Sequence, residues 1–172
     1  TAAWLASCQE QDGAVGWERR RHVDAWNHVE AAMALTAFDQ AEAADAAYDW
    51  LRVSQRPDGT WPMRSTRGVV QDGSADTNQV AYVAVGVWHH WLVRGERAFV
   101  ERMWPTVVRA LDWVAARQLE WGGIAWNEAV DGELWDTALL AGSSSIVHSL
   151  DCGMLLGDLL GVDTSEWRGV RQ

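Results

Sequence analysis

The sequence predicts an all-α protein built from helical hairpins, and two observations lead to this class. One loop pattern occurs three times along the chain, and the segments between its copies have the hydrophobic spacing of helices. A repeat of this length indicates stacked units of supersecondary structure. We therefore expect a single domain over residues 1–172, made of units of about 1–61, 62–126 and 127–172.

The repeated loop combines a glutamine, a glycine and a closing tryptophan. Its copies are "SCQEQDGAVGW" (7–17), "SQRPDGTW" (54–61) and "ARQLEWGGIAW" (116–126). A further tryptophan stands five residues before each glutamine, so the repeated positions are Trp4, Gln9 and Trp17; Trp50, Gln55 and Trp61; and Trp113, Gln118 and Trp126.

Two kinds of helix alternate between these loops. The segment "VDAWNHVEAAMALTAF" (23–38) is apolar around most of its circumference, as in a helix buried on several sides. The segment "AEAADAAYDWLRVS" (41–54) has one apolar stripe, which indicates a helix packed on one side only. The order in the first unit is therefore an inner helix, an outer helix and then the loop.

The second and third units repeat this order. Asp76 and Thr77 can cap the inner helix "NQVAYVAVGVWHHWLVR" (78–94), which Gly95 ends. Since proline breaks helix interiors, we expect the main part of the following outer helix to begin at Pro105, after a short turn. In "GSSSIVHSLDCGMLLGDLLG" (142–161) the serines are expected as caps and Gly161 as the end.

Alternating inner and outer helices close naturally into a ring. The sequence therefore predicts an (α/α)6 toroid, of which this chain supplies about three hairpins; a flat helical solenoid is the alternative. The segments "TAAWLASC" and "SEWRGV" lack the polar outer face of a terminal repeat. We expect that residues 1–172 are not stable alone as a monomer, and that further hairpins of the same protein or a homo-oligomer partner complete the ring.

Composition excludes several classes of partner. A net charge of -10 argues against binding nucleic acid and against docking on an anionic membrane. No apolar run approaches the roughly 18 residues of a spanning helix, and the first residues do not resemble a signal peptide.

Cys8 and Cys152 are expected to be buried thiols of a cytoplasmic protein. The 13 tryptophans exceed structural need and indicate a surface that stacks sugar rings or other flat ligands.

Two families resemble parts of this sequence. The Q-x-x-x-G-x-W loops are similar to the QW repeats of squalene cyclases and prenyltransferase β-subunits, which share the α/α toroid. Residues 76–118 resemble the glucoamylase-like six-hairpin glycosidases more closely, through an inner helix, a short acidic turn and an AF-x-x-x-x-WP outer helix. In that family a W-E motif and a serine-rich helix entry follow, and "WNEAVDGELWDTALLAGSSSIVHSL" (126–150) offers both, with extra residues between them.

The glycosidase resemblance implies catalytic carboxylates. Asp24 stands at the start of an early inner helix, where that family places an acidic residue that contacts the sugar at the cleavage point. Helix capping explains Asp24 equally simply. Glu128 lies one position after the family's W-E acid, whose place Asn127 occupies, and Asp136 directly follows Trp135. The sequence does not choose between Glu128 and Asp136, and both also fit solvated loop carboxylates.

Polar and aromatic side chains near the same helix starts are expected to contact substrate. They are Trp26, Asn27, His28, Asp76, Asn78, Gln79, Trp126 and Trp135. Asp76 also fits a helix cap, and His28 also fits a hydrogen-bonded core residue. No H-E-x-x-H, paired C-x-x-C, phosphate loop or nucleophile elbow occurs, so we expect neither a metal nor a cofactor.

The sequence thus favours a glycoside hydrolase acting on an α-linked polysaccharide or oligosaccharide. Its expected mechanism is inverting, with a carboxylic acid and a carboxylate roughly 6.5–9.5 Å apart. One alternative is an enzyme like the prenyltransferases or terpenoid cyclases, although D-x-D-D, D-D-x-x-D and D-x-C motifs are all missing. The other is a helical toroid that binds carbohydrate without catalysis.

Overall fold

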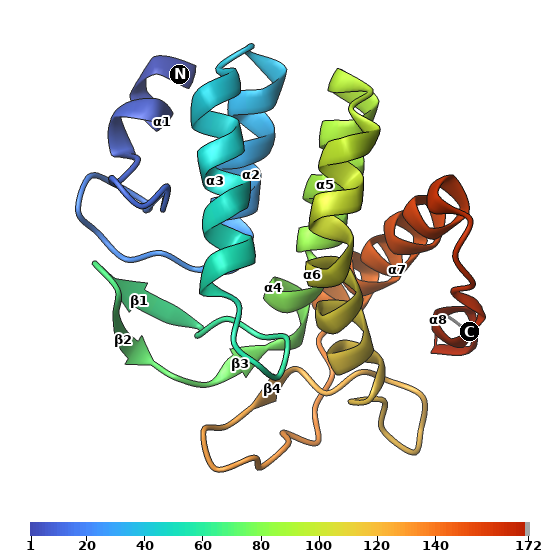
Figure 1. Cartoon of the computed structure of the whole chain (residues 1–172). Helices are drawn as coiled ribbons and strands as arrows, with labels where there is room; N and C mark the ends of the chain where they lie inside the picture. Colours follow the sequence, from blue (N-terminus) through green and yellow to red (C-terminus); the bar gives the residue numbers. More distant parts are fainter. Residues whose placement is uncertain (171–172) are drawn as a thin grey trace.

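The computed structural model describes residues 1–170, so the last two residues of the third expected unit lie outside it. It consists mainly of two rows of helices (Figure 1). The inner row comprises α2 (Ala25–Ala37), α4 (Thr77–Ala81), its continuation α5 (Val83–Arg94), and α7 (Leu140–Leu160). The outer row comprises α1 (Ala2–Cys8), α3 (Ala41–Ser54), α6 (Arg97–Ala115) and α8 (Ser165–Val170).

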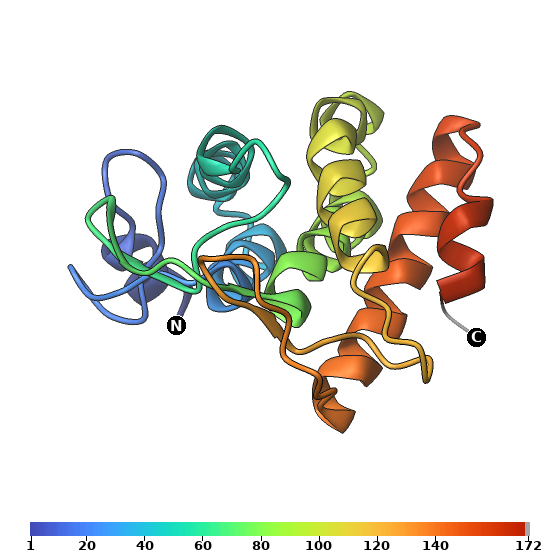
Figure 2. The same ribbon diagram turned by 90° about the horizontal axis from the view of Figure 1, so that it is seen from below.

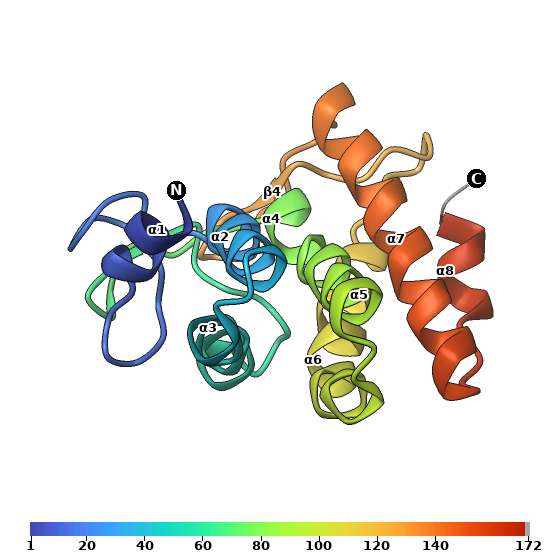
Figure 3. The ribbon, with the colours of Figure 1, turned by 90° about the horizontal axis from the view of Figure 1, so that it is seen from above.

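The two rows form an open arc. Viewed from above, α2, α4 with α5, and α7 follow one another, and α3 and α6 lie next to each other along the outer side of this row (Figure 3). Helices α1 and α8 lie at opposite ends of this arc (Figures 2 and 3). The predicted alternation of inner and outer helices is confirmed. No helix within residues 1–170 combines the length and the apolar content needed to cross a bilayer.

The predicted helix ends agree with the structure at several positions. The Asp24 side chain caps α2 by accepting the backbone N–H of Asn27, and Asp76 caps α4 by accepting that of Gln79, each over 2.9 Å. Gly95 and Gly161 end α5 and α7 in the left-handed conformation that glycine adopts without strain.

Two predicted helix starts were wrong. Helix α6 begins at Arg97 and passes through Pro105, because Phe99, Val100 and Met103 are buried and hold the preceding turns on the core. Pro105 lies on the exposed side, and the carbonyl of Glu101 that loses its helical partner is also on an exposed residue. Helix α7 begins at Leu140, so the serines lie inside the helix rather than at its cap.

Four short strands, which the all-α prediction did not include, lie at the loop end of the helices (Figure 1). Strands β1 (Arg64–Thr66) and β2 (Val69–Asp72) form an antiparallel hairpin whose turn residues, Arg67 and Gly68, both have positive φ. Strands β3 (Ala75–Asp76) and β4 (Asn127–Glu128) pair antiparallel, with Asp76 opposite Asn127. The second pair joins two loops that are far apart in the sequence.

The repeated glutamines join successive outer helices. In every copy the side-chain amide donates to the carbonyl of the loop glycine four residues later, at Gly13, Gly59 and Gly122. The same Nε2 also donates to a carbonyl of the next outer element: Gln9 to Ala43, Gln55 to Thr106 and Gln118 to Val170, over 2.8, 2.9 and 3.4 Å. The repeat is therefore a clamp that sets the spacing between neighbouring hairpins.

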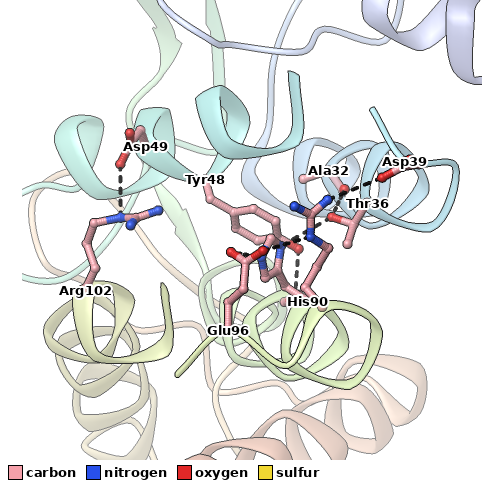
Figure 4. Close-up of polar contacts among 10 residues, drawn as sticks. Ala32, Thr36, Asp39, Tyr48, Asp49, His90, Glu96 and Arg102 are labelled. Atoms are coloured by element: carbon pink, nitrogen blue, oxygen red, sulfur yellow. Dashed lines mark hydrogen bonds and ion pairs between the residues drawn. The ribbon is translucent and has the colours of Figure 1, made fainter. Parts of the chain in front are cut away.

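The core lies between the two rows, and polar contacts reinforce it (Figure 4). Tyr48 of α3 is fully buried and donates to the carbonyl of Gly86 in α5 over 2.8 Å. On the rim of the core, Arg102 of α6 forms a 3.7 Å ion pair with Asp49 of α3. These contacts join the first hairpin to the second.

Candidate functional site

A cavity of about 450 Å³ lies at the N-terminal ends of α2 and α4. Its lining combines aromatic, amide and charged side chains: Trp17, His22, Asp24, Trp26, Asn27, Met63, Arg64, Asp72 and Gln79. Four of the eleven residues predicted from the sequence are among them, namely Asp24, Trp26, Asn27 and Gln79. A larger hollow of about 830 Å³ beside the first loop, which includes Arg19, Arg20 and Arg67, contains none of the predicted residues.

Asp24 is the buried carboxylate of this cavity, with 5% of its surface exposed. Trp17 Nε1 donates to its Oδ2 over 2.5 Å, and the backbone N–H of Asn27 donates to Oδ1 over 2.9 Å. Asn27 Nδ2 lies 3.1 and 3.0 Å from the two carboxylate oxygens. The capping role and the position on the cavity are thus both realised in one side chain, whose orientation these donors determine.

Asp76 has a similar environment at the next inner helix. Its Oδ1 accepts the backbone N–H of Gln79, and its Oδ2 accepts Trp126 Nε1 over 2.6 Å. Burial raises the pKa of the Asp76 carboxyl, and the negative charge of Asp24 raises it further. Asp76 does not, however, belong to the residues that line the cavity. It braces the third loop against α4 rather than facing a ligand there.

Trp126 and Trp135 also lie off the cavity. Their rings contact each other edge to face, with centroids 5.0 Å apart, and Trp135 is 47% exposed. Asn78 is buried, and its Oδ1 has no hydrogen-bond partner within the described residues. These three residues lie around the start of α4. Of the residues predicted there, Gln79 is the one that lines the cavity.

The structure does not bring Glu128 or Asp136 to Asp24. In β4 the side chains alternate, so Glu128 points to the opposite side from Asn127, which is paired with Asp76. Arg117 Nη2 binds Glu128 Oε2 over 2.6 Å, while the Arg117 guanidinium lies 3.9 Å from the Trp113 ring centroid. Asp136 is exposed and accepts Trp121 Nε1 over 3.3 Å.

Glu128 also begins a fourth copy of the loop, which was not predicted from the sequence. The turn 128–134 has the same backbone hydrogen bonds as the first loop: Gly132 N–H to the Ala129 carbonyl here, Gly13 N–H to the Glu10 carbonyl there. Gln9 bridges to Val15 and Glu128 to Leu134, each six residues on. Glu128 replaces the glutamine, but the Asp131-Gly132 pair and the closing Trp135 remain, and these are the signal that could have revealed the copy.

Of the two interpretations of His28, a substrate contact and a hydrogen-bonded core residue, the structure supports the second. His28 is 0% exposed, because its ring lies between the first loop and α3. Its Nδ1 accepts the backbone N–H of Val15 over 3.0 Å, and Nε2 lies 2.9 Å from the Ala47 carbonyl, to which it donates. Burial lowers the pKa of His28 to about 4. The side chain is a neutral cross-link of the core.

We expect His28 to make the protein less stable in acid. Unfolded histidine takes up a proton near pH 6.5, whereas the folded pKa is about 4, so stability is full above pH 6.5 and declines as the pH falls toward 4. The loss is about 3 kcal/mol. Denaturant unfolding at a series of pH values measures it. His28→Gln removes this titration and should flatten the slope; an unchanged slope in that variant would contradict the assignment.

The remaining cavity residues were not predicted, and tertiary structure brings most of them there. Met63, Arg64 and Asp72 come from the β1–β2 hairpin and the segment that leads into it. Trp17 was recognised only as a repeat position, although its bond to Asp24 places it in the site. Residues 1–170 hold no group of three or more His, Cys, Asp and Glu side chains arranged to bind a metal ion.

Comparison with known proteins gives one sequence relative. No protein-family description matched the chain. The protein from Mycolicibacterium hassiacum called MMP endo-(1,4)-3-O-methyl-alpha-D-mannosidase is 49% identical over 167 residues. The match covers 97% of this chain and 46% of the relative, so the chain spans about half the length of the curated relative it matches.

Solved structures share the fold at low sequence identity. A sugar epimerase from a ruminal bacterium has a TM-score of 0.70 at 10% identity, covering 98% of this chain and 49% of that one. An alpha-amylase from Clostridium perfringens has a TM-score of 0.67 at 10% identity, with the same two coverages. These comparisons do not support the resemblance to squalene cyclases and prenyltransferases. The chain has the fold of the α/α-toroid enzymes and supplies about half of such a ring.

Proposed function

We propose that this chain is part of a glycoside hydrolase that cleaves within an α-linked mannose polysaccharide. The observation that carries the proposal is the cavity at the start of α2, where the buried Asp24 carboxylate lies beside Trp17 and Trp26. Indole rings stack on sugars, and amides and charges such as Asn27, Gln79 and Arg64 suit their hydroxyl groups. The name of the 49% identical relative, an endo-(1,4)-3-O-methyl-alpha-D-mannosidase, supports the substrate class, a (1→4)-linked, 3-O-methylated α-mannose chain.

The proposed mechanism is inverting and uses two carboxyl groups. One protonates the leaving oxygen and the other activates water on the opposite face of the sugar, at a separation of roughly 6.5–9.5 Å. Asp24 provides one of them. Its four contacts are all with hydrogen-bond donors, which suits the negatively charged member of the pair. Glu128 and Asp136 do not border the cavity, and Asp72, the other carboxylate that lines it, already accepts the N–H and the hydroxyl of Ser74. We therefore propose that the second carboxyl group comes from outside these residues.

We further propose that hairpins outside these residues complete the ring, either in the same polypeptide or in a partner copy. A relative about twice as long supports the first of these sources. The repeat units of about 1–61, 62–126 and 127–172 then form one partial domain. Two free, buried cysteines are consistent with the cytoplasm as the proposed compartment.

The test is cleavage of α-(1→4)-linked mannose oligosaccharides, with and without 3-O-methyl groups, by the complete protein. We expect internal cleavage, and NMR spectra recorded early in the reaction should show the β-anomer as the first product. An α-anomer would contradict inversion but not hydrolysis. Binding without any turnover would instead support the non-catalytic toroid, and turnover of an isoprenoid diphosphate would support the cyclase alternative. The charged and amide lining of the cavity speaks against that last outcome.

A further inference from the structure

A tyrosine and a glutamate join two inner helices just below the cavity. Tyr82 lies at the junction of α4 and α5, and its hydroxyl donates to Glu30 Oε1 of α2 over 2.5 Å. The Trp26 ring contacts Tyr82 edge to face, with centroids 5.5 Å apart and planes at 77°. Trp26 and Glu30 are one helical turn apart, so they lie one below the other on the same face of α2.

This face of α2 is available to a ligand. Trp26 is 38% exposed and Glu30 is exposed, although their helix is otherwise largely buried. The only hydrogen bond of the Glu30 carboxylate within residues 1–170 is the one from Tyr82, so its second oxygen remains open. Tyr82 is itself only partly buried, and both burial and the Glu30 carboxylate raise its pKa to about 12. The phenol therefore stays protonated and continues to donate at neutral pH.

The surface between Glu30 and the Asp24 cavity is continuous. It borders a second cavity of about 310 Å³ together with Trp17 and Asn27, and these two residues also line the cavity at Asp24. Trp26 connects the same two places, since it lines the Asp24 cavity and touches Tyr82. A polymeric ligand in the Asp24 cavity can therefore extend along α2 as far as Glu30.

We propose that Trp26, Glu30 and Tyr82 form a sugar subsite next to Asp24. One sugar unit stacks on Trp26, and its hydroxyl groups donate to the open oxygen of Glu30, which Tyr82 holds in position. The sugar class rests on the proposed function, while the site itself rests on these contacts. A carboxylate forms stronger hydrogen bonds to hydroxyl groups than a neutral acceptor does, and a prearranged one loses less entropy on binding. Glu30 is a binding residue, and Tyr82 is a positioning residue that acts through it.

The test compares Glu30→Gln, Tyr82→Phe and the double variant in the complete protein, with an α-(1→4)-linked mannose tetrasaccharide as the probe. Glu42→Gln is the matched control, because Glu42 is an exposed glutamate on the outer helix α3. We expect Glu30→Gln to raise KM about 10- to 100-fold with little change in kcat. Tyr82→Phe should have a smaller effect, and the double variant should lose no more than Glu30→Gln. The control should match the parent.

The outcomes separate this proposal from the proposed function. If the parent cleaves the probe and Glu30→Gln keeps its KM, the subsite is wrong and the hydrolase stands. If the parent binds the probe in calorimetry without cleaving it, and Glu30→Gln abolishes that binding, the subsite stands and the hydrolase is wrong. Equal losses in Glu42→Gln, or additive losses in the double variant, would also overturn the arrangement. Melting temperatures of all variants show whether Tyr82→Phe acts only by loosening the helices.

Discussion

Replacing Asp24 by Asn is expected to lower kcat on a mannose oligosaccharide by about 10²- to 10⁴-fold, the usual contribution of a positioned acid or base. The substitution preserves the shape of the side chain, and Asn caps helices as well as Asp does. The substitution removes the negative charge at the cavity. It also replaces the oxygen that accepts Trp17 Nε1 in the parent protein by an NH2 group, which is a donor. Steady-state kinetics of the complete protein measures the loss, with circular dichroism to check the fold.

Asp76→Asn is the matched control for this prediction. Asp76 also caps an inner helix and accepts an indole N–H, from Trp126, but it does not line the cavity. A purely structural role would therefore give both variants similar losses of stability and of activity. We expect similar stability in the two variants and near-parental turnover in Asp76→Asn alone. Full activity in Asp24→Asn would remove Asp24 from the mechanism.

Replacing Gly59 by Ala is expected to cost several kcal/mol of stability. Gly59 has a φ of +98°, and an added Cβ would lie 2.4 Å from the Arg109 carbonyl oxygen of α6. The backbone strain costs about 1–3 kcal/mol, and relieving the clash costs a similar amount again. The close approach exists because Gln55 clamps this loop to the Thr106 carbonyl of the same helix.

Gly122→Ala separates the two contributions to that loss. Its φ is +96°, but a Cβ there would meet no atom within 4 Å. The variant therefore suffers the backbone strain without the clash, and we expect it to lose about 1–3 kcal/mol less than Gly59→Ala. Denaturant unfolding of both variants measures the difference. Equal losses would mean that the second loop is not pressed against α6 as described.

The regular part of the fold was predictable because it depends on local patterns. The apolar faces of 23–38 and 41–54, the caps at Asp24 and Asp76 and the stops at Gly95 and Gly161 all follow from side-chain periodicity and backbone preference. Pro105 shows the limit of such patterns, since packing of its buried neighbours kept α6 continuous against the preference of proline. The β1–β2 hairpin is too short for its alternation to be recognised.

The site was predictable only where it belongs to one helix. Asp24, Trp26 and Asn27 stood out as polar and aromatic residues at the start of an apolar helix. Met63, Arg64 and Asp72 come to the cavity through a hairpin that no local pattern places there. Glu128 could not be judged from its neighbours in sequence, because strand alternation turns it toward Arg117. For His28 the sequence allowed both a substrate contact and a hydrogen-bonded core residue, and only the packing of the first loop and α3 shows that both ring nitrogens bond to backbone groups.

The most direct test of a sugar-cleaving site at the start of α2 is a crystal structure of the complete Asp24→Asn protein with a mannose oligosaccharide bound. We expect the saccharide to fill the cavity lined by Trp17, Trp26 and Gln79, with the bond to be cleaved beside residue 24. A carboxyl group from another hairpin should face residue 24 across that bond, at roughly 6.5–9.5 Å from its side chain. An oligosaccharide bound elsewhere in the ring, with this cavity left to solvent, would contradict the account.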